Sequence, residues 1–452
     1  MVLRRKAATT STHDVCVVGS GFAGTFVALR LAELGVRTLL LEAGVAPEAD
    51  APVDGRGDRL PVVETGDAVP ITADNRAIEL GGTSRRWNGV CTRLLPDDFQ
   101  NATRHGYAVD WPITFDDLAP FYDRAEQVLH VHGSPRVPAA EPPRPPYPVE
   151  RPAPAVPSPF SGMPSFPLAF GTRDGAPTRL VEAELPAFAA SPYGTLLTDR
   201  TVTRLHTDRR GRVTEVEVRT SDGTVERHRA AHVVLAAGVI ETVRVLLSST
   251  SPRFPDGIGN DHGLVGRYLH GHPRLRRPVT RTTSDVDARG VHRSYAPGEA
   301  SRAAGHGALA FDVNADDELM MVTVTSEFEP VAANRVTLDP TTLDASGRPV
   351  LRVDAHRTAA DAATTAAARD ALAAAGAEGE PDLTWFHPAG TCRMGATAET
   401  GVVDRDGRVF GTDNLHVCGA AVFPTSGPTN PTLTVVALAL RLADHLATLV
   451  RR

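Results

Sequence analysis

The chain has 452 residues, a formal net charge of −7 and 42% hydrophobic residues. Nucleic acids and anionic membranes select clustered basic surfaces, so an acidic chain is a poor match for either as its main partner. The sequence contains no run of about 18 uninterrupted apolar residues, the length that a transmembrane helix needs. We therefore expect a large globular protein with no membrane span, whose partners are small molecules.

The N-terminal segment MVLRRKAATTSTHD carries basic residues, but no apolar stretch follows them as in a secretory signal. We therefore expect a cytoplasmic protein, in a compartment where thiols stay reduced. The cysteines show no CxxC spacing; they are Cys16, Cys91, Cys392 and Cys418. We expect free, buried thiols, with neither a disulfide framework nor a zinc site.

The first strong pattern is DVCVVGSGFAGTFVALRLAELGVRTLLLEAG, residues 14–44. Apolar runs at 15–18 and 36–41 predict buried strands, and residues 26–34 have the periodicity of a helix. Between the first strand and the helix, Gly19, Gly21 and Gly24 form a GxGxxG turn. In a βαβ unit such a turn brings the backbone close to a pyrophosphate, which the helix N-terminus attracts. Glu42 ends the second strand, where a carboxylate can accept a hydrogen bond from a ribose hydroxyl.

Two segments follow whose roles are less specific. The run AIELGGTSRRWNGV, residues 77–90, has a glycine pair that suits backbone laid against a flat ligand, although a plain surface loop is the alternative. Residues 134–167 are rich in proline and include AEPPRPPYP, so we expect an extended arm without helix. The arm is either a simple connection or a lid or oligomer contact over a cleft.

The rest of the chain alternates between two kinds of strand. The runs TLLTD, TRLHTD, VTEVEVRT and TVERHRA predict strands, and AHVVLAAGVIET predicts a buried parallel strand followed by a helix. From residue 318, LMMVTVTSEFEP, RVTLDP and PVLRVDAH predict an antiparallel sheet, and residues 358–376 an alanine-rich helix. We expect an α/β protein with a discontinuous nucleotide-binding domain (12–130, 195–280 and 400–452). An α+β domain (131–194 and 281–399), built on the antiparallel sheet, is inserted into it.

Several motifs, in this order, resemble the glucose-methanol-choline (GMC) oxidoreductase family. They are VVGSGFAG, LLLEAG, GGTS, VVLAAGVIET, GLVGRYLHGHP, NRVTLDP, HPAGTCRMG and NLHVCGAAVFPTSGPTNPTLTVVALALRLADHL. The runs GGTSRRW and PTNPTLT look nearest to the branch of pyranose 2-oxidase and the glycoside 3-oxidases. The resemblance implies a Rossmann-like, p-hydroxybenzoate hydroxylase-like domain with FAD as cofactor. It also implies oxidation of a CH–OH group of a sugar, glycoside or cyclitol.

By resemblance, His387 of HPAGTCRMG is the catalytic base and Asn430 of TNPTLT is its partner. The chemistry agrees, since an alcohol gives up hydride readily only as its proton leaves, and imidazole accepts protons near neutral pH. We expect Pro388 to hold the backbone of the histidine, and Ala389 and Gly390 to leave room for the flavin ring. Asn430 would orient the substrate oxygen without competing for the proton.

The expected cofactor contacts are spread along the chain. They are Gly19, Gly21, Gly24, Glu42, Thr83, Ser84, Trp87, Asn88, Gly89, Gly419, Ala420, Pro431 and Thr432. Pro431 is expected at the first position of the last helix, whose N-terminus would face the flavin. Covalent relatives have a histidine where this chain has Arg86, so the FAD should be bound non-covalently.

Other residues are expected to have no chemical role. Cys392 beside Arg393 could be a reactive thiol, and His270 with His272 a metal pair, but a structural role is favoured for both pairs and no metal is expected. The alternatives in function are a hydroxynitrile lyase-like enzyme, a dehydrogenase of a non-sugar alcohol, a silent flavin-binding partner and a nicotinamide-dependent reductase. The sequence leaves open the substrate, the position oxidised, the oligomeric state and the electron acceptor, which could be oxygen, a quinone or a protein.

Overall fold

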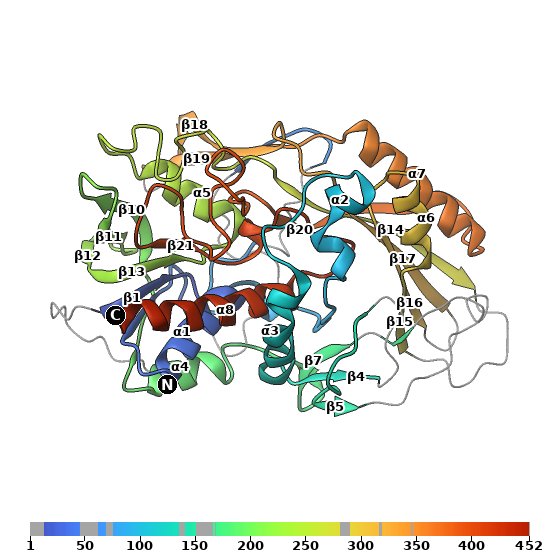
Figure 1. The fold of residues 1–452 in the computed structure, drawn as a ribbon, viewed down its shortest axis with the longest axis horizontal. Coiled ribbons are helices and arrows are strands. Elements are labelled where there is room, and N and C mark those ends of the chain that lie inside the picture. The colour runs from blue at the N-terminus through green and yellow to red at the C-terminus, as the bar shows by residue number, and fades with distance from the viewer. Residues whose placement is uncertain are drawn as a thin grey trace.

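The computed structural model describes residues 13–45, 62–68, 76–134, 141–150, 166–167, 169–280, 290–315, 319–344 and 347–451. Two large sheets organise these residues, one parallel and one antiparallel. In Figure 1 the parallel sheet lies toward the left, and the antiparallel sheet lies toward the right. The structure is therefore of the mixed α/β type expected, with a parallel sheet and separate antiparallel sheets.

The parallel sheet has the strand order β21-β13-β1-β2-β9, and every neighbouring pair in it is parallel. Its strands are β1 (His13–Val18), β2 (Thr38–Leu41), β9 (Gly194–Leu197), β13 (Ala230–Leu235) and β21 (Leu415–Val417). Four of the five were visible as apolar runs because a parallel sheet is covered on both faces. The predicted βαβ unit is confirmed, since α1 (Phe22–Glu33) connects β1 to its parallel neighbour β2.

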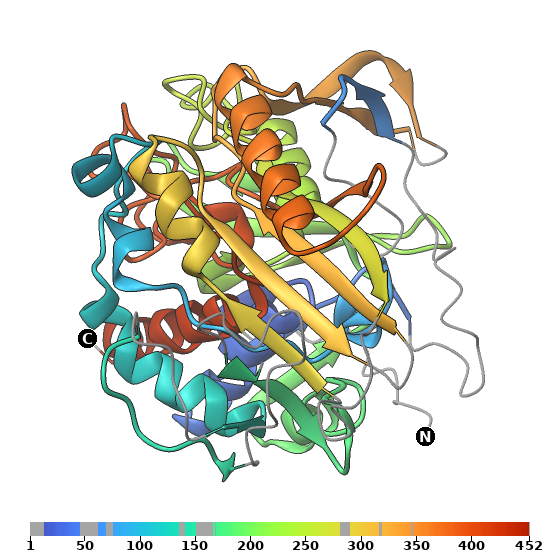
Figure 2. The ribbon, with the colours of Figure 1, turned by 90° about the vertical axis from the view of Figure 1, so that its right-hand side faces the viewer.

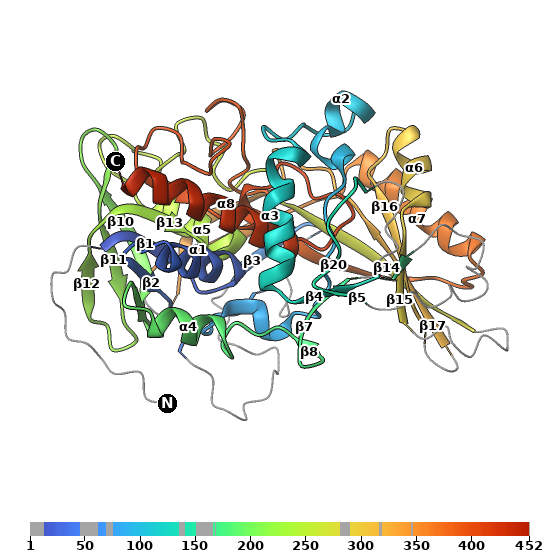
Figure 3. The same cartoon turned by 60° about the horizontal axis from the view of Figure 1, so that its bottom comes forward.

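The longest helix, α8 (Thr432–Val450), packs against α1 and α3 (Phe115–Val128), as Figure 3 shows. It is long and apolar enough to cross a membrane, but 67% of its apolar stretch is buried inside the protein. No other helix in the described ranges passes that test. The burial of α8 is that of a core helix.

The second large sheet has the order β20-β14-β17-β16-β15-β6 and is antiparallel throughout. Its strands are β6 (Phe166–Pro167), β14 (His270–Thr280), β15 (Gly290–Ser294), β16 (Leu309–Ala315), β17 (Leu319–Ser326) and β20 (Asp382–Ala389). One face packs on the alanine-rich helix α7 (Ala359–Ala374), which crosses the strands in Figure 2. The apolar residues of this face include Leu275, Phe311 and Val324, which lie opposite one another across the strands.

Because side chains alternate along a strand, the other face of the same sheet carries the intervening residues. Several of these are polar, including His272, Arg274, Thr325 and Asp312, while Phe386, Ala310 and Met321 on the same face are apolar. The six-stranded sheet therefore has one face that belongs to a hydrophobic core and one that is suited to a polar ligand.

Smaller elements complete the described structure. Three further sheets contain β10 (Thr201–Thr207), β11 (Val213–Arg219) and β12 (Val225–His228); β3 (Val62–Thr65), β18 (Arg335–Leu343) and β19 (Pro349–Asp354); and β4 (Val131–Gly133), β5 (Val149–Glu150), β7 (Phe170–Arg173) and β8 (Ala176–Pro177). The remaining helices are α2 (Asn101–His105), α4 (Glu184–Ala190), α5 (Gly238–Ser248) and α6 (Ala296–Ala303), with short 3-10 turns η2 (Gly82–Arg86), η3 (Pro96–Phe99) and η4 (Ala420–Val422).

One expectation about the strands was wrong. RVTLDP and PVLRVDAH were expected to join the strand at 319–326 in one antiparallel sheet, but β18 and β19 form a separate sheet with β3. Strand β3 lies almost 300 residues before its partner β19 in the sequence. Local sequence patterns carry no information about a pairing over such a separation. The domain boundaries stay a prediction, although β14, assigned to the nucleotide-binding domain up to residue 280, pairs within the antiparallel sheet. Most of the proline-rich arm lies outside the described residues.

Candidate active site

The turn between β1 and α1 has the shape of a phosphate cradle. Gly19 has φ +95°, and a Cβ there would lie 2.6 Å from the carbonyl oxygen of Ala236. A Cβ on Gly24 would lie 1.8 Å from the oxygen of Gly19. Both glycines are therefore required by packing. A Cβ on Gly21, by contrast, would meet no atom within 4 Å, so the middle glycine borders open space at the N-terminus of α1.

Glu42 is buried beside this turn and organises it. One carboxylate oxygen accepts hydrogen bonds from the backbone N–H and the hydroxyl of Ser20, at 2.8 and 2.6 Å. The other accepts from the N–H of Gly44 at 2.7 Å. Burial raises the pKa of Glu42, and these hydrogen bonds oppose the shift. The hydrogen bond from a ribose hydroxyl to this carboxylate stays a prediction.

The loop at 81–89 lies against the same turn. A Cβ on Gly82 would be 3.3 Å from the Cα of Gly21, and the rings of Trp87 and Phe22 meet edge to face at 4.9 Å. Two buried donors of this loop, the Ser84 hydroxyl and the Trp87 indole N–H, have no hydrogen-bond partner among the described residues. Unpaired buried donors beside an open cradle are what a bound dinucleotide such as FAD would satisfy.

The other predicted cofactor contacts border this region or remain untested. Gly419 approaches α1, since a Cβ on it would lie 3.5 Å from the side chain of Ala23, and Ala420 begins η4. Pro431 occupies the N-cap of α8 and Thr432 is the first helical residue, so the expectation of Pro431 at the first helical position was off by one. Thr83 lies in η2, while Asn88 and Gly89 follow it.

The guanidinium of Arg86 is bound to Glu79 at 2.8 Å, and non-covalent binding of FAD stays a prediction.

His387 stands on a distorted part of β20. Its φ is +56°, a left-handed value that costs a non-glycine residue free energy and that occurs preferentially at functional sites. The pairing with β14 is irregular here, since His270 faces Ala389 while His272 faces Phe386. The extra residue on β20 is a β-bulge, which re-aims a side chain next to an active site. The strain therefore turns His387 out of the regular alternation of the strand.

A chain of hydrogen bonds leads to His387. His272 Nε2 is 2.6 Å from the carbonyl oxygen of Gly427, and its Nδ1 is 2.9 Å from Nδ1 of His387. A carbonyl oxygen only accepts, so the proton of neutral His272 is on Nε2 and its Nδ1 is an acceptor. His387 must then donate from Nδ1. Its Nε2 is left without a proton, as a base requires.

Asn430 faces that free nitrogen. Its Nδ2 lies 3.5 Å from His387 Nε2, and its Oδ1 accepts from a terminal nitrogen of Arg293 at 3.3 Å. Arg293 can only donate, so this contact assigns the amide orientation and directs the NH₂ group toward the histidine. Arg293 is itself held by two hydrogen bonds to Asp312, at 2.7 and 2.9 Å. Burial opposes the charge of Arg293, but Asp312 outweighs it and raises the pKa. The structure thus brings together the two residues predicted as catalytic.

The environment keeps these histidines neutral. The side chain of His387 is partly exposed, but protein atoms surround most of it. This loss of hydration lowers the pKa of His387 well below the usual value. The positive charge of Arg274 acts in the same direction. Burial also lowers the pKa of His272 to about 3. At neutral pH both rings are therefore uncharged, so Nδ1 of His272 can accept a hydrogen bond and Nε2 of His387 can accept a proton.

Sequence reasoning assigned a merely structural role to His272, although it contacts the predicted base. The neighbouring His270 does have that role, because its Nδ1 donates to the carbonyl of Tyr268 at 2.9 Å. Gly390 was expected to make room for the flavin, but a Cβ there would lie 2.4 Å from the His270 ring, so the glycine serves this packing.

All cysteines are buried and free, and burial raises the pKa of Cys392 to about 12. Within the described ranges no cluster of potential metal ligands occurs.

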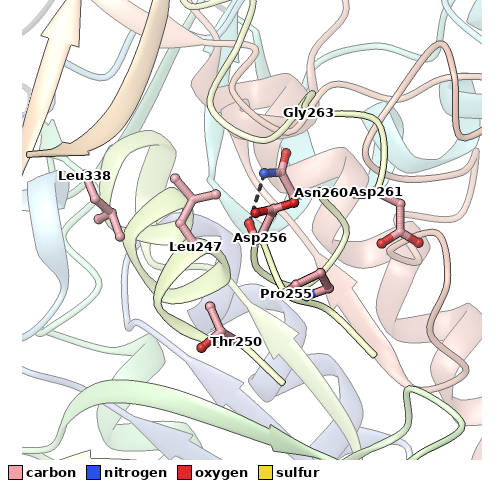
Figure 4. A pocket seen from close by; sticks show the side chains of 8 residues that line it. All are labelled: Leu247, Thr250, Pro255, Asp256, Asn260, Asp261, Gly263 and Leu338. Carbon is pink, nitrogen blue, oxygen red and sulfur yellow. Dashed lines mark hydrogen bonds between the residues drawn. The ribbon is translucent and has the colours of Figure 1, made fainter. Parts of the chain in front are cut away.

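A surface pocket of about 500 Å³ lies elsewhere, between the end of α5 and the following loop (Figure 4). It is lined by Leu247, Thr250, Pro255, Asp256, Asn260, Asp261, Gly263 and Leu338. None of the predicted site residues is among them, and its walls hold no histidine. The predicted site residues therefore lie outside this pocket.

Gly21→Val tests the cradle. The backbone of Gly21 (φ −66°, ψ −174°) suits any residue, and the space is open, so the variant should fold with the thermal stability of the apoprotein. Its side chain should occupy the pyrophosphate position and abolish FAD retention, measured as flavin absorbance relative to protein absorbance. Gly24→Ala is the contrasting control, because its methyl group would clash with backbone and should destabilise the fold. Full flavin content in Gly21→Val would contradict the placement.

The chain is similar to several known proteins along nearly its whole length. A 2-methyl-1,2-propanediol dehydrogenase of Mycolicibacterium austroafricanum is 29% identical, over 97% of this chain and 96% of its own length. A 6'''-hydroxyparomomycin C oxidase of Streptomyces lividus is 31% identical, over 96% and 92% respectively. The crystal structure of a pyridoxine 4-oxidase from "Mesorbium loti" superimposes with a TM-score of 0.66 at 20% identity, covering 96% of this chain and 99% of that one.

The family assignment rests on two matched regions together with these relatives. Residues 160–274 match the N-terminal model of the GMC oxidoreductases, and residues 330–439 match the C-terminal one. The second region contains His387 and Asn430, and the first ends at Arg274, just past His272. The chain belongs to the GMC oxidoreductase family, and it is an FAD-dependent oxidoreductase that acts on the CH–OH group of alcohols.

Proposed function

We propose that this enzyme oxidises a CH–OH group of a sugar, glycoside or cyclitol to a carbonyl, with His387 as the base. The observation that carries the proposal is the hydrogen-bond chain from Gly427 through His272 to Nδ1 of His387. It leaves His387 Nε2 unprotonated and directed toward Asn430, where a substrate hydroxyl can be held by both residues.

The chain's own residues divide the work of moving the proton. His387 Nε2 accepts the hydroxyl proton, and the imidazolium that forms keeps its Nδ1–H bonded to His272. Asn430 donates its NH₂ group to the substrate oxygen, because Arg293 holds the other end of the amide. FAD, when bound in the cradle, supplies the hydride acceptor. Base and amide are thus positioned before substrate arrives, which lowers the entropic cost of reaching the transition state.

The substrate class is supported by the polar face of the six-stranded sheet. Side chains that alternate with the core on these strands include the imidazole of His272, the guanidinium of Arg274 and the hydroxyls of Thr325 and Thr384, which a polar substrate can contact. Apolar side chains, among them Phe386 and Ala310, share the face. One relative is named as an oxidase of 6'''-hydroxyparomomycin C and another as a dehydrogenase of 2-methyl-1,2-propanediol, which carries a second hydroxyl. A polyhydroxylated substrate fits this surface best.

His387→Ala should keep FAD bound but slow flavin reduction by substrate about 10²- to 10⁴-fold under anaerobic conditions, the usual contribution of a general base. Asn430→Ala should slow flavin reduction less, because the base remains.

The lowered pKa of His387 also predicts the pH dependence of the wild type. The active form is the neutral one, so the rate should stay at its plateau as pH falls through 6.5 and decline only at more acidic pH. An unchanged reduction rate in His387→Ala would rule out the base assignment, and a midpoint at or above 6.5 would refute the electrostatic account.

His272→Phe should expose the role of the second histidine. The variant keeps an aromatic ring but removes the acceptor for the Nδ1–H of His387, whose hydrogen bond becomes charge-assisted once His387 is protonated. Loss of such a bond should lower the limiting rate of flavin reduction about 10- to 100-fold and leave substrate Kd nearly unchanged. His270→Phe is the matched control, since His270 is equally buried yet does not contact His387. Equal rate losses in the two variants would show that His272 acts only through packing.

A further inference from the structure

A row of three polar side chains crosses the sheet beside the catalytic pair. Arg274 of β14 lies opposite Thr384 of β20 on one side and opposite Thr325 of β17 on the other. His272 precedes Arg274 by two residues on the same strand. Its side chain therefore points to the same face, about 7 Å along the strand. The row is thus the next layer of the sheet outward from the residue that positions the base.

Arg274 has no counter-ion in this row. Among the described residues its guanidinium makes no hydrogen bond or ion pair, and Nε is buried without a partner. The group lies over the ring of Phe386 at 5.0 Å and is partly exposed. The hydroxyls of Thr325 and Thr384 are also buried and unpartnered. Burial lowers the pKa of Arg274, as expected for a cation whose charge is not fully compensated.

The other arginine near the catalytic pair shows the contrast. Arg293 is fully buried, but its guanidinium donates hydrogen bonds to both carboxylate oxygens of Asp312, which balances its charge. It also donates to Asn430 and Thr92. Asp312 is thereby occupied, and it acts on Arg274 only through space. Of the two arginines next to the catalytic pair, Arg274 is therefore the one without a carboxylate partner among the described residues.

We propose that Arg274 binds a carboxylate of the substrate, so that the enzyme oxidises a CH–OH group of a sugar acid rather than of a neutral sugar. A planar guanidinium recognises a carboxylate through two parallel hydrogen bonds, and a single negative charge balances the single positive one. The strand spacing separates the carboxylate from the oxidised carbon by several bonds. Beyond Arg274, Arg276 and Asp382 are exposed, so the outer end of the face is open to an entering ligand. This inference rests on the proposed function, because the position of Arg274 matters only relative to His387.

The test compares acids with matched neutral sugars on the FAD-loaded enzyme. Anaerobic flavin reduction is measured with glucuronate and gluconate against glucose and glucitol, in wild type, Arg274→Gln and Arg276→Gln. Arg276 is the control because it lies on the same strand and face but is exposed. We expect Arg274→Gln to lower the preference for acids, measured as the ratio of kcat/KM values, about 10- to 100-fold. Arg276→Gln should change that ratio little.

A binding measurement separates this inference from the proposed function. Acetate, titrated against its neutral isostere acetamide, should perturb the visible flavin spectrum of wild type and of His387→Ala, with a Kd about 10- to 100-fold weaker in Arg274→Gln. If Arg274→Gln leaves acetate binding unchanged, the carboxylate site is wrong. It is also wrong if Arg274→Gln slows flavin reduction equally with acids and with neutral sugars, because Arg274 would then act only on His387. Loss of FAD from Arg274→Gln also overturns it, because the guanidinium would then belong to the cofactor. Normal acetate binding with no flavin reduction by any sugar would instead refute the proposed function.

Discussion

The hydrogen bond between the Nδ1 atoms of His272 and His387 depends on groups from three distant parts of the chain. The two histidines come from neighbouring strands, and the carbonyl that sets the tautomer of His272 belongs to Gly427, in the turn before α8. His272 can accept this bond at Nδ1 only while it is neutral, and His387 can take a proton at Nε2 only while it is neutral itself. The burial that lowers both pKa values is therefore part of the arrangement and not an accident of packing. Strain at His387 and the bulge in β20 serve the same contact.

The two sheets contribute different halves of the enzyme. Strand β1 of the parallel sheet leads into the glycine turn. A Cβ on Gly21 would meet open space there, whereas a Cβ on Gly19 or Gly24 would clash with backbone atoms. The antiparallel sheet uses its strand alternation to separate tasks, because one face packs on α7 while the other presents His272 and Arg274. A substitution that slipped the register of β14 by one residue would exchange these faces and would destroy core and site together.

Sequence reasoning succeeded where the signal is local. The βαβ unit, its glycine turn and the buried thiols follow from short patterns with direct physical meaning. His387 and Asn430, which were selected by resemblance to the family, do lie side by side, and their catalytic roles stay predictions. It failed where pairing is distant. His272 was thought merely structural because its contact with His387 spans 115 residues. The isolated charge of Arg274 is visible only once the register shows threonines, and not carboxylates, on either side. The partnership of β19 with β3 was hidden for the same reason.

Neutron diffraction from crystals exchanged into D₂O would test the central contact most directly, because it locates the exchangeable protons on the imidazole rings. The account predicts deuterium on Nε2 of His272 and on Nδ1 of His387, with Nε2 of His387 bare at neutral pD. Deuterium on Nε2 of His387, with none between the two Nδ1 atoms, would contradict it, because the base would then be in the wrong tautomer to accept a proton from substrate.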